Sequence, residues 1–463
     1  MKINRILFLF LLLMAFDALA QSTKTAEEIR KERAAERATM KSIREKYGVD
    51  SLQKYMSVKM MEEREQWMKN MLLRLEEDAV IRKDDYINET NPEEVEKLDL
   101  SFMKLTEVPD WVFRFKNLKS LKLANNKISR LPKRLVELDS LKTLDFSKNE
   151  LGKVKCKSPK LASVKYLNLS GNEMSSLPGQ IKKFKHINKL TIDNNNFRRI
   201  PKRMKKLKKL ETLSIGNNEL KEFGSNFKYL RKLSNFSAIN AAKCDIQSIP
   251  DEIALLINLK KLYLQENKIS YISPEIGQLG RLEELSLYKN ELPEVPYELF
   301  DCTELTELDL FYNKIKLIPA DISRLKKISN LYLSFNELEY LPESIGDMKL
   351  REIFVHDNKL TSLPESLKDI SMLETIRFDN NYITEFPEQL LGLKKIKYID
   401  FSKTDVAILP KDIVNFKDLE LLVFDSQPID KDDPKNANFE NILKTLDDRG
   451  VILNVTEEDE VKN

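Results

Sequence analysis

Leucine and isoleucine recur at fixed positions through most of this 463-residue chain. In the segment 305–319, apolar residues stand at Leu305, Leu308, Leu310, Ile315 and Ile318, and the segment 328–342 repeats the same order. The spacing of Leu308 and Leu310 predicts a short β-strand, because alternate side chains of a strand point to the same face. The later apolar residues are expected to fill the interior of the same unit after the chain turns.

An asparagine follows each predicted strand at a nearly constant interval, usually 23 residues. Self-similarity at such a period is typical of a solenoid, in which neighbouring units stack because one unit cannot bury its apolar face alone. The asparagine amide can bind the backbone groups that lose their strand partners at the turn. The series consists of Asn126, Asn149, Asn172, Asn195, Asn218, Asn267, Asn290, Asn313, Asn336, Asn358 and Asn381.

The repeated Leu-x-x-Leu-x-Leu-x-x-Asn pattern, with a proline closing most units, resembles the leucine-rich-repeat superfamily. It is most similar to the 23-residue typical subclass of Ras-suppressor-like and Scribble-like scaffold proteins. The resemblance implies an α/β solenoid, a horseshoe with a parallel concave β-sheet and about 15 repeats over residues 91–430. The sixth unit is longer than the others, and we expect a bulge near residues 224–232. The asparagine is replaced at Met103, Cys244, Thr404 and Gln427.

The first 20 residues predict a signal peptide. Lys2 and Arg5 begin it, an apolar run of eleven residues follows over 6–16, and Ala18 and Ala20 form a small-x-small cleavage site. The run is shorter than the about 20 residues that a membrane-spanning helix needs. A buried N-terminal helix is the alternative. We therefore expect an exported protein without a membrane span, either periplasmic or secreted.

Both flanks of the repeat region differ from it in composition. Residues 21–90 are rich in charged residues and predict helices that cap the first repeat, with a coiled-coil or partner-binding segment as the alternative. After Pro434, residues 438–446 predict a short helix and 451–455 a last strand. Residues 431–463 are therefore expected to form a C-terminal cap and a charged tail, with no catalytic domain after the repeats.

Composition favours a soluble protein of a bacterial envelope. Charged residues make up 33% of the chain, the formal net charge is +3, and the three cysteines, Cys156, Cys244 and Cys302, lie far apart. An exported chain with so few thiols is not a disulfide scaffold. It also lacks the cysteine-rich caps that flank many animal extracellular repeat proteins.

Aromatic residues gather at predicted solvent-facing positions in the eighth to twelfth units. Because neighbouring strands lie about 4.8 Å apart, these side chains are expected to form a continuous patch, with carboxylates such as Glu307 and Glu352 beside it. Such a patch has the anatomy of a protein-binding site. The alternatives are rings that pack on each other for stability, or a pocket for an aromatic or sugar ligand. The predicted partner-binding residues are Tyr263, Tyr288, Phe311, Tyr312, Tyr332, Phe335, Phe354 and His356, with Tyr398 further along.

A basic segment is the second candidate surface. Residues 153–232 contain 21 basic and 5 acidic residues, a balance of +16. Ile200, Met204 and Leu207 are expected to face inward, which places the basic residues on the convex side. This predicts weak contact with a polyanion or an anionic surface, and the alternative is a solvated lysine-rich face. No row of aromatic residues interleaves the lysines, so specific nucleic-acid recognition is not expected. The basic patch comprises Arg198, Arg199, Lys202, Arg203, Lys205, Lys206, Lys208 and Lys209.

Candidate catalytic residues are few. The chain has two histidines, His186 and His356, and no group of residues with metal-ligand spacing. Ser334, His356 and Asp379 occupy one column on three consecutive predicted strands, but an open sheet offers no oxyanion hole and no cleft that excludes water. We expect a non-enzymatic protein, without cofactor or metal, that binds a protein partner through its concave face. The alternative is the substrate-recognition part of an effector enzyme.

Overall fold

The computed structural model describes residues 91–151, 163–177, 179–425, 427–429 and 434–454, together with 83–88 and positions 71, 73, 75 and 77. The chain divides into two compact units, Met1–Glu89 and Thr90–Asn463. In the first unit residues 83–88 are helical. The predicted signal peptide and most of the predicted N-terminal helical segment lie outside the described residues and stay predictions. Within the described part, no helix is both long enough and apolar enough to cross a membrane.

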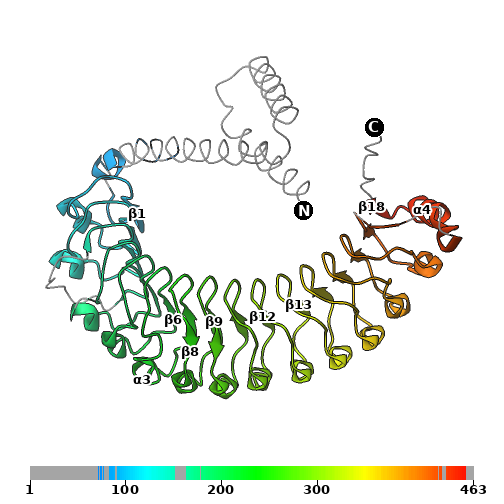
Figure 1. Cartoon of the computed structure of the whole chain (residues 1–463). Coiled ribbons are helices and arrows are strands. Elements are labelled where there is room, and N and C mark those ends of the chain that lie inside the picture. The colour runs from blue at the N-terminus through cyan, green and yellow to red at the C-terminus, as the bar shows by residue number, and fades with distance from the viewer. Residues whose placement is uncertain are drawn as a thin grey trace, which may run out of the picture. The chain divides into compact units, whose positions relative to one another are not determined.

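The second unit is built on one parallel β-sheet, which holds 16 strands within the described residues (Figure 1). Each strand pairs in parallel with the strand of the next repeat, and the inward leucines align, as Leu285 does with Leu308. The predicted leucine-rich-repeat solenoid is therefore confirmed. The strands are β1 (Lys97–Asp99), β2 (Ser120–Lys122), β3 (Thr143–Asp145), β4 (Tyr166–Asn168), β5 (Lys189–Thr191), β6 (Thr212–Ser214), β7 (Ala238–Asn240), β9 (Lys261–Tyr263), β11 (Glu284–Ser286), β12 (Glu307–Asp309), β13 (Asn330–Tyr332), β14 (Glu352–Phe354), β15 (Thr375–Arg377), β16 (Tyr398–Asp400), β17 (Leu421–Val423) and β18 (Ile452–Asn454).

Short 3-10 helices lie on the outer side of this unit, opposite the sheet (Figure 1). Most begin directly after the proline that closes a repeat, as η9 does after Pro319. Proline fits there because its fixed φ leads into the helix and its missing N–H removes no helical hydrogen bond. The helices are η1 (Asp110–Arg114), η2 (Lys133–Glu137), η4 (Gly179–Lys183), η5 (Lys202–Lys206), η6 (Asp251–Leu255), η7 (Pro274–Gln278), η8 (Tyr297–Asp301), η9 (Ala320–Arg324), η10 (Glu343–Asp347), η11 (Glu365–Asp369), η12 (Glu388–Gly392), η13 (Lys411–Asn415) and η14 (Pro434–Asn436).

Three segments depart from the simple repeat. In the longer sixth unit the extra residues form one α-helical turn, α3 (Phe227–Leu230), where the sequence predicted a bulge. A second small parallel sheet joins β8 (Ser248–Ile249) and β10 (Tyr271–Ile272). At the C-terminal end, α4 (Phe439–Asp448) forms near the predicted helix and buries Phe439, Ile442 and Leu446. Strand β18 then extends the sheet beyond the last repeat.

Burial confirms the register that the repeat pattern predicted. Leu308, Leu310 and Ile315 are at most 1% exposed, and Leu331 is fully buried. Tyr332, the next residue along β13, is only partly buried, as expected for the opposite face of the strand. The core is thus a continuous column of leucine, isoleucine and phenylalanine side chains inside the coil, and the intervening strand residues form its concave surface.

The asparagines form a ladder of shared hydrogen bonds along this core. Asn313 Nδ2 donates to the carbonyls of Leu287 (3.0 Å) and Leu310 (3.1 Å), and its Oδ1 accepts from the Leu292 N–H (3.2 Å). The Leu310 carbonyl also accepts from Asn336 Nδ2 at 2.9 Å. Each asparagine therefore links its own repeat to the one before, and successive asparagines share a carbonyl.

The structure explains why Cys244 is tolerated in place of asparagine. The N–H of Leu220, which by its position in the repeat would bind the asparagine oxygen, donates to the backbone carbonyl of Cys244 at 3.0 Å. The Cys244 Sγ lies 3.3 Å from the carbonyl of Ile215 and donates a hydrogen bond to it, as the asparagine amide does to the equivalent carbonyl in other repeats. A change of backbone path in this longer repeat thus replaces the missing acceptor.

Candidate functional site

Aromatic rings on and beside strands β11 to β14 form a connected group on the concave face. Tyr312 stacks on Phe335 with ring centroids 3.9 Å apart and planes inclined by 6°. Tyr332 stacks on Phe354 at 5.4 Å, and Phe311 lies 6.0 Å from Tyr332 and 6.3 Å from Phe335, so it joins the two stacks. The group is named the aromatic cluster here and comprises Tyr288, Phe311, Tyr312, Tyr332, Phe335 and Phe354.

Most rings of the aromatic cluster are half-buried, and Tyr312 is 36% exposed. They contact each other, yet each remains partly exposed. His356 differs, because it is only 7% exposed and its ring lies against Phe311 (5.7 Å) and Phe335 (5.1 Å). The prediction that His356 faces solvent is therefore wrong, since the two phenylalanine rings cover it.

Tyr263 and Tyr398 stand apart from the aromatic cluster. Neither has a ring contact with another aromatic residue in the part of the chain that the structure describes. The Tyr263 hydroxyl donates to the Glu284 carboxylate, and burial together with this carboxylate raises the pKa of Tyr263. The Tyr398 hydroxyl donates to Asp400 Oδ2 at 3.3 Å. The network of ring contacts therefore covers fewer strands than the predicted patch, because it does not include Tyr263 or Tyr398.

Two members of the aromatic cluster occupy a backbone conformation that bulky residues rarely adopt. Tyr312 has φ 55° and Phe335 has φ 56°, both in the left-handed region. The equivalent position holds Asn125, Lys148 and Asn194 in other repeats. The turn therefore needs a residue that tolerates positive φ, and it does not need an aromatic ring.

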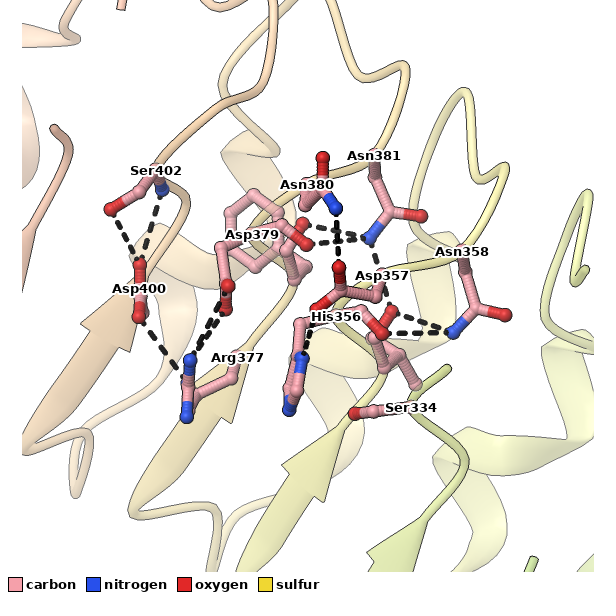
Figure 2. A network of polar contacts seen from close by, with 12 residues as sticks. Ser334, His356, Asp357, Asn358, Arg377, Asp379, Asn380, Asn381, Asp400 and Ser402 are labelled. Atoms are coloured by element: carbon pink, nitrogen blue, oxygen red, sulfur yellow. Dashed lines mark hydrogen bonds and ion pairs between the residues drawn. The ribbon is translucent and has the colours of Figure 1, made fainter. Parts of the chain in front are cut away.

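A group of polar side chains adjoins the aromatic cluster at the ends of β13 to β16 (Figure 2). It is named the polar cluster here and comprises His356, Asp357, Arg377, Asp379, Asn380 and Asp400. His356 Nδ1 lies 2.8 Å from Asp357 Oδ2, and Asn380 donates to the other oxygen of Asp357. Burial opposes ionisation of Asp357, but the hydrogen bonds from His356 and Asn380 outweigh it and lower the pKa of Asp357. Asp357 is therefore held as a carboxylate beside the imidazole.

Arg377 lies between two further carboxylates of the polar cluster (Figure 2). Its Nη2 is 3.2 and 3.3 Å from the two oxygens of Asp379, and its Nε is 3.3 Å from Asp400 Oδ2. The Nε contact with Asp400 is close enough for an ion pair, although it lacks the alignment of a hydrogen bond. Burial and the nearby charge of Asp400 raise the pKa of Asp379 to about 6.

The structure does not assemble the catalytic triad that the column of Ser334, His356 and Asp379 could suggest. Ser334 is fully buried, and its Oγ has no hydrogen-bond partner among the described residues. His356 binds the adjacent Asp357 and makes no hydrogen bond with Ser334 in the described part of the chain. Sequence reasoning missed Asp357, Arg377 and Asp400 as members of this cluster. The signal for Arg377 and Asp400 was that they replace the aromatic residues of the column that contains Tyr332 and Phe354.

The described thiols offer no nucleophile. Cys244 and Cys302 are buried, and burial raises the pKa of each to about 12. A thiol is reactive as its thiolate, which is scarce at neutral pH when the pKa is so high. Cys156 lies outside the described residues.

The basic patch lies on and beside η5, as predicted. Ile200, Met204 and Leu207 are fully buried, whereas the basic residues are exposed except for the half-buried Lys205. Arg199 is 3.3 Å from Glu222, and the Lys205 Nζ lies 5.0 Å from the ring centre of Tyr229. A single ring beside one lysine is not the row of stacking platforms that single-stranded nucleic acids require.

Comparisons with known proteins agree with this architecture. A family model described as leucine rich repeat matches residues 93–151 and 280–338. A leucine-rich-repeat protein of Leptospira interrogans is 28% identical with a TM-score of 0.67, covering 80% of this chain and 98% of its own. An internalin of Listeria monocytogenes is 19% identical with a TM-score of 0.57, covering 70% of this chain and 94% of its own.

A plant peptide hormone receptor is 24% identical with a TM-score of 0.52, covering 73% of this chain and 60% of its own. No curated relative matches the chain. Taken with the fold and the asparagine ladder, these findings show that the chain belongs to the leucine-rich-repeat superfamily. Proteins of this superfamily use the surface of the stacked strands to bind other proteins.

Proposed function

We propose that this protein is exported and binds a protein partner through the aromatic cluster on its concave face. The observation that carries the proposal is a connected set of half-exposed rings, two of them at positive-φ positions that most other repeats fill with polar residues. Aromatic side chains are enriched at the energetic centres of protein interfaces. The inward leucines, such as Leu310 and Leu333, fill the core without help from these rings.

Export is supported by the charged start, the short apolar run and the small residues before Gln21. The two described cysteines are unpaired and buried, so this part of the fold does not rely on disulfides. A periplasmic or secreted leucine-rich-repeat protein of a bacterial envelope fits this combination.

Replacing Phe311 and Tyr332 together by alanine tests the proposed interface. Truncation of an interface hot spot costs about 2 kcal/mol or more, roughly thirtyfold in affinity. The double variant should lose capture of the partner that wild-type protein retains from envelope extracts of the native organism. Tyr166→Ala is the matched control, because Tyr166 is a half-buried ring on strand β4 of the same sheet, outside the aromatic cluster.

The melting temperature of each variant separates binding from packing. Each lost ring pair contributes only about 0.5–1.5 kcal/mol beyond area burial, so the Phe311→Ala/Tyr332→Ala variant should remain folded at 25 °C. Unchanged capture by the folded double variant would contradict the proposal. If the double variant unfolds, the single variants Phe311→Ala and Tyr332→Ala, measured at lower temperature, decide the question in the same way.

A second candidate activity is attraction of a polyanion by the basic patch. Its support is the exposure of these cations on one outer edge of the solenoid, where Arg199 alone among them forms an ion pair with a described acidic residue. Unpaired cations in such density create a local positive potential that attracts anionic polymers or surfaces.

A further inference from the structure

We propose that His356, Asp357 and Asp379 form a binding site for a divalent transition-metal ion such as Zn²⁺. Each offers one ligand atom, and these three atoms all lie within 4.8 Å of one another. One imidazole and two carboxylates are a donor set that suits divalent ions such as Zn²⁺ or Mn²⁺. The proposal does not depend on the protein-binding role of the aromatic cluster.

The register of the sheet creates this cluster. Tyr332, Phe354 and Arg377 are paired on adjacent strands, and the residues two positions later therefore form the next aligned row on the same face. That row contains Ser334, His356 and Asp379. Asp357 joins it from the turn, where φ of 54° directs its side chain back toward the imidazole that it contacts at 2.8 Å.

Ser334 places an unpartnered polar group beside this site. It is fully buried, and its hydroxyl oxygen has no hydrogen-bond partner among the described residues. Figure 2 shows this hydroxyl beside His356, with its oxygen toward the imidazole ring. Buried polar atoms are almost always satisfied, so an orphan hydroxyl at the edge of the cluster calls for a partner. A water bound to the ion would supply it.

The charges of the polar cluster also favour a cation. Asp357, Asp379 and Asp400 bring three carboxylates together, while Arg377 is the one guanidinium in contact with two of them. The exposed Lys403 acts on Asp357 only through the longer-range Coulomb interaction. Negative charge that is partly buried and not fully compensated is costly, and a divalent ion would offset it.

Metal binding would rearrange contacts without moving the backbone far. Zn²⁺ binds nitrogen and carboxylate oxygen at about 2.0–2.2 Å, so the His356–Asp357 hydrogen bond would give way to two bonds to the ion. Arg377 would keep its contact with Asp400 while Asp379 turns one oxygen to the metal. Phe311 and Phe335, whose rings lie against His356, would shield the ion from bulk solvent on that side.

Zinc titration of the untagged chain from residue 21 onward, after treatment with a chelator, tests the proposal. Isothermal titration calorimetry with ZnCl₂ should show one saturable site. His356→Ala should weaken it by at least about 100-fold, since loss of even an outer-shell partner costs a metal site 10–100-fold. Asp379→Asn should weaken it as well. His186→Ala is the matched control because His186 is the other histidine of the chain and is exposed. This control variant should bind Zn²⁺ with the affinity of the wild type.

Histidine NMR detects metal binding without relying on the heat of binding that calorimetry measures. With two histidines in the chain, ¹⁵N-labelled imidazoles give two sets of signals, and Zn²⁺ should shift only the set that His356→Ala removes. Absence of a saturable site in the wild type would overturn the proposal. So would affinity that survives in both His356→Ala and Asp379→Asn, or that is lost in His186→Ala. If His356→Ala fails to fold, the calorimetry of Asp379→Asn and the wild-type NMR titration decide, with His186→Ala assigning the two sets of imidazole signals.

Discussion

The shared hydrogen bonds of the asparagine ladder lead to a quantitative prediction for Asn313→Ala. The substitution removes two donors and one acceptor from the interior of the solenoid. The acceptor served the buried N–H of Leu292, which has no other partner among the described residues. The donors served the carbonyls of Leu287 and Leu310, which still accept from Asn290 and Asn336. They also reach the Phe311 carbonyl at 3.3 Å, which still accepts from the Lys289 N–H. One backbone group is therefore orphaned, two lose half of their hydrogen bonds, and Phe311 loses only the longest of the three contacts.

The size of the effect follows from this distinction. Leaving a buried N–H unsatisfied costs about 1–3 kcal/mol, and each lost hydrogen bond whose acceptor keeps a partner costs about 0.5 kcal/mol. We expect Asn313→Ala to lower the free energy of unfolding by about 2–4 kcal/mol. Asn313→Asp should cost at least as much at neutral pH, because it places a carboxylate against the same two carbonyls.

The shared carbonyl also predicts coupling between neighbouring asparagines. In the double variant Asn313→Ala/Asn336→Ala, the Leu310 carbonyl loses both of its side-chain donors. The loss of stability should then exceed the sum of the single losses by about 1 kcal/mol or more. Asn313→Ala/Asn381→Ala is the control, because Asn381 donates to Val355 and Phe378 and shares no carbonyl with Asn313.

Equilibrium urea unfolding followed by circular dichroism measures these values, and a constant slope of free energy against urea would show that the same amount of structure unfolds in each variant. A loss below about 0.5 kcal/mol for Asn313→Ala would refute the ladder argument, because that is less than one typical hydrogen bond. Strict additivity of the Asn313/Asn336 pair would show that the carbonyl is not shared in solution.

Two further predictions concern export and the basic patch. N-terminal sequencing of the protein from its native host should begin at or near Gln21, and recovery of intact Met1 in the soluble cytoplasm would contradict export. Exchange of Lys205, Lys206, Lys208 and Lys209 for glutamine should lower the salt concentration at which the protein leaves a heparin column, because polyanion binding releases counterions and depends steeply on salt. Equal retention of this variant and the wild type would show a merely solvated surface. The control exchanges the exposed Lys394, Lys395, Lys411 and Lys417 and should change retention less.

The repeat register could be predicted from sequence because it depends on local and periodic features. A strand directs alternate side chains to one face, so Leu308 and Leu310 had to point inward together. The constant spacing of the asparagines then places each at the same turn of its coil. Every coil packs against similar coils on either side. The environment of a residue in one repeat therefore predicts the environment of the residue at the equivalent position in the next repeat.

The contents of the concave face depended on the tertiary structure. Periodicity placed His356 on the solvent side of its strand, but the rings of Phe311 and Phe335 from neighbouring coils cover it. The same reasoning found the column of Ser334 and Asp379, yet not the contact between His356 and Asp357. These outcomes depend on side-chain rotamers and on the size of residues one coil away.

The sixth repeat shows the same division between sequence and structure. The sequence alone revealed that Cys244 replaces an asparagine and that the sixth unit, which precedes it, is long. Only the folded chain shows that the additional residues form α3, and that the Cys244 carbonyl accepts the hydrogen bond that an asparagine would have accepted. A backbone hydrogen bond can be satisfied by any group that reaches it, so its partner is decided by the path of the chain in three dimensions and not by residue type.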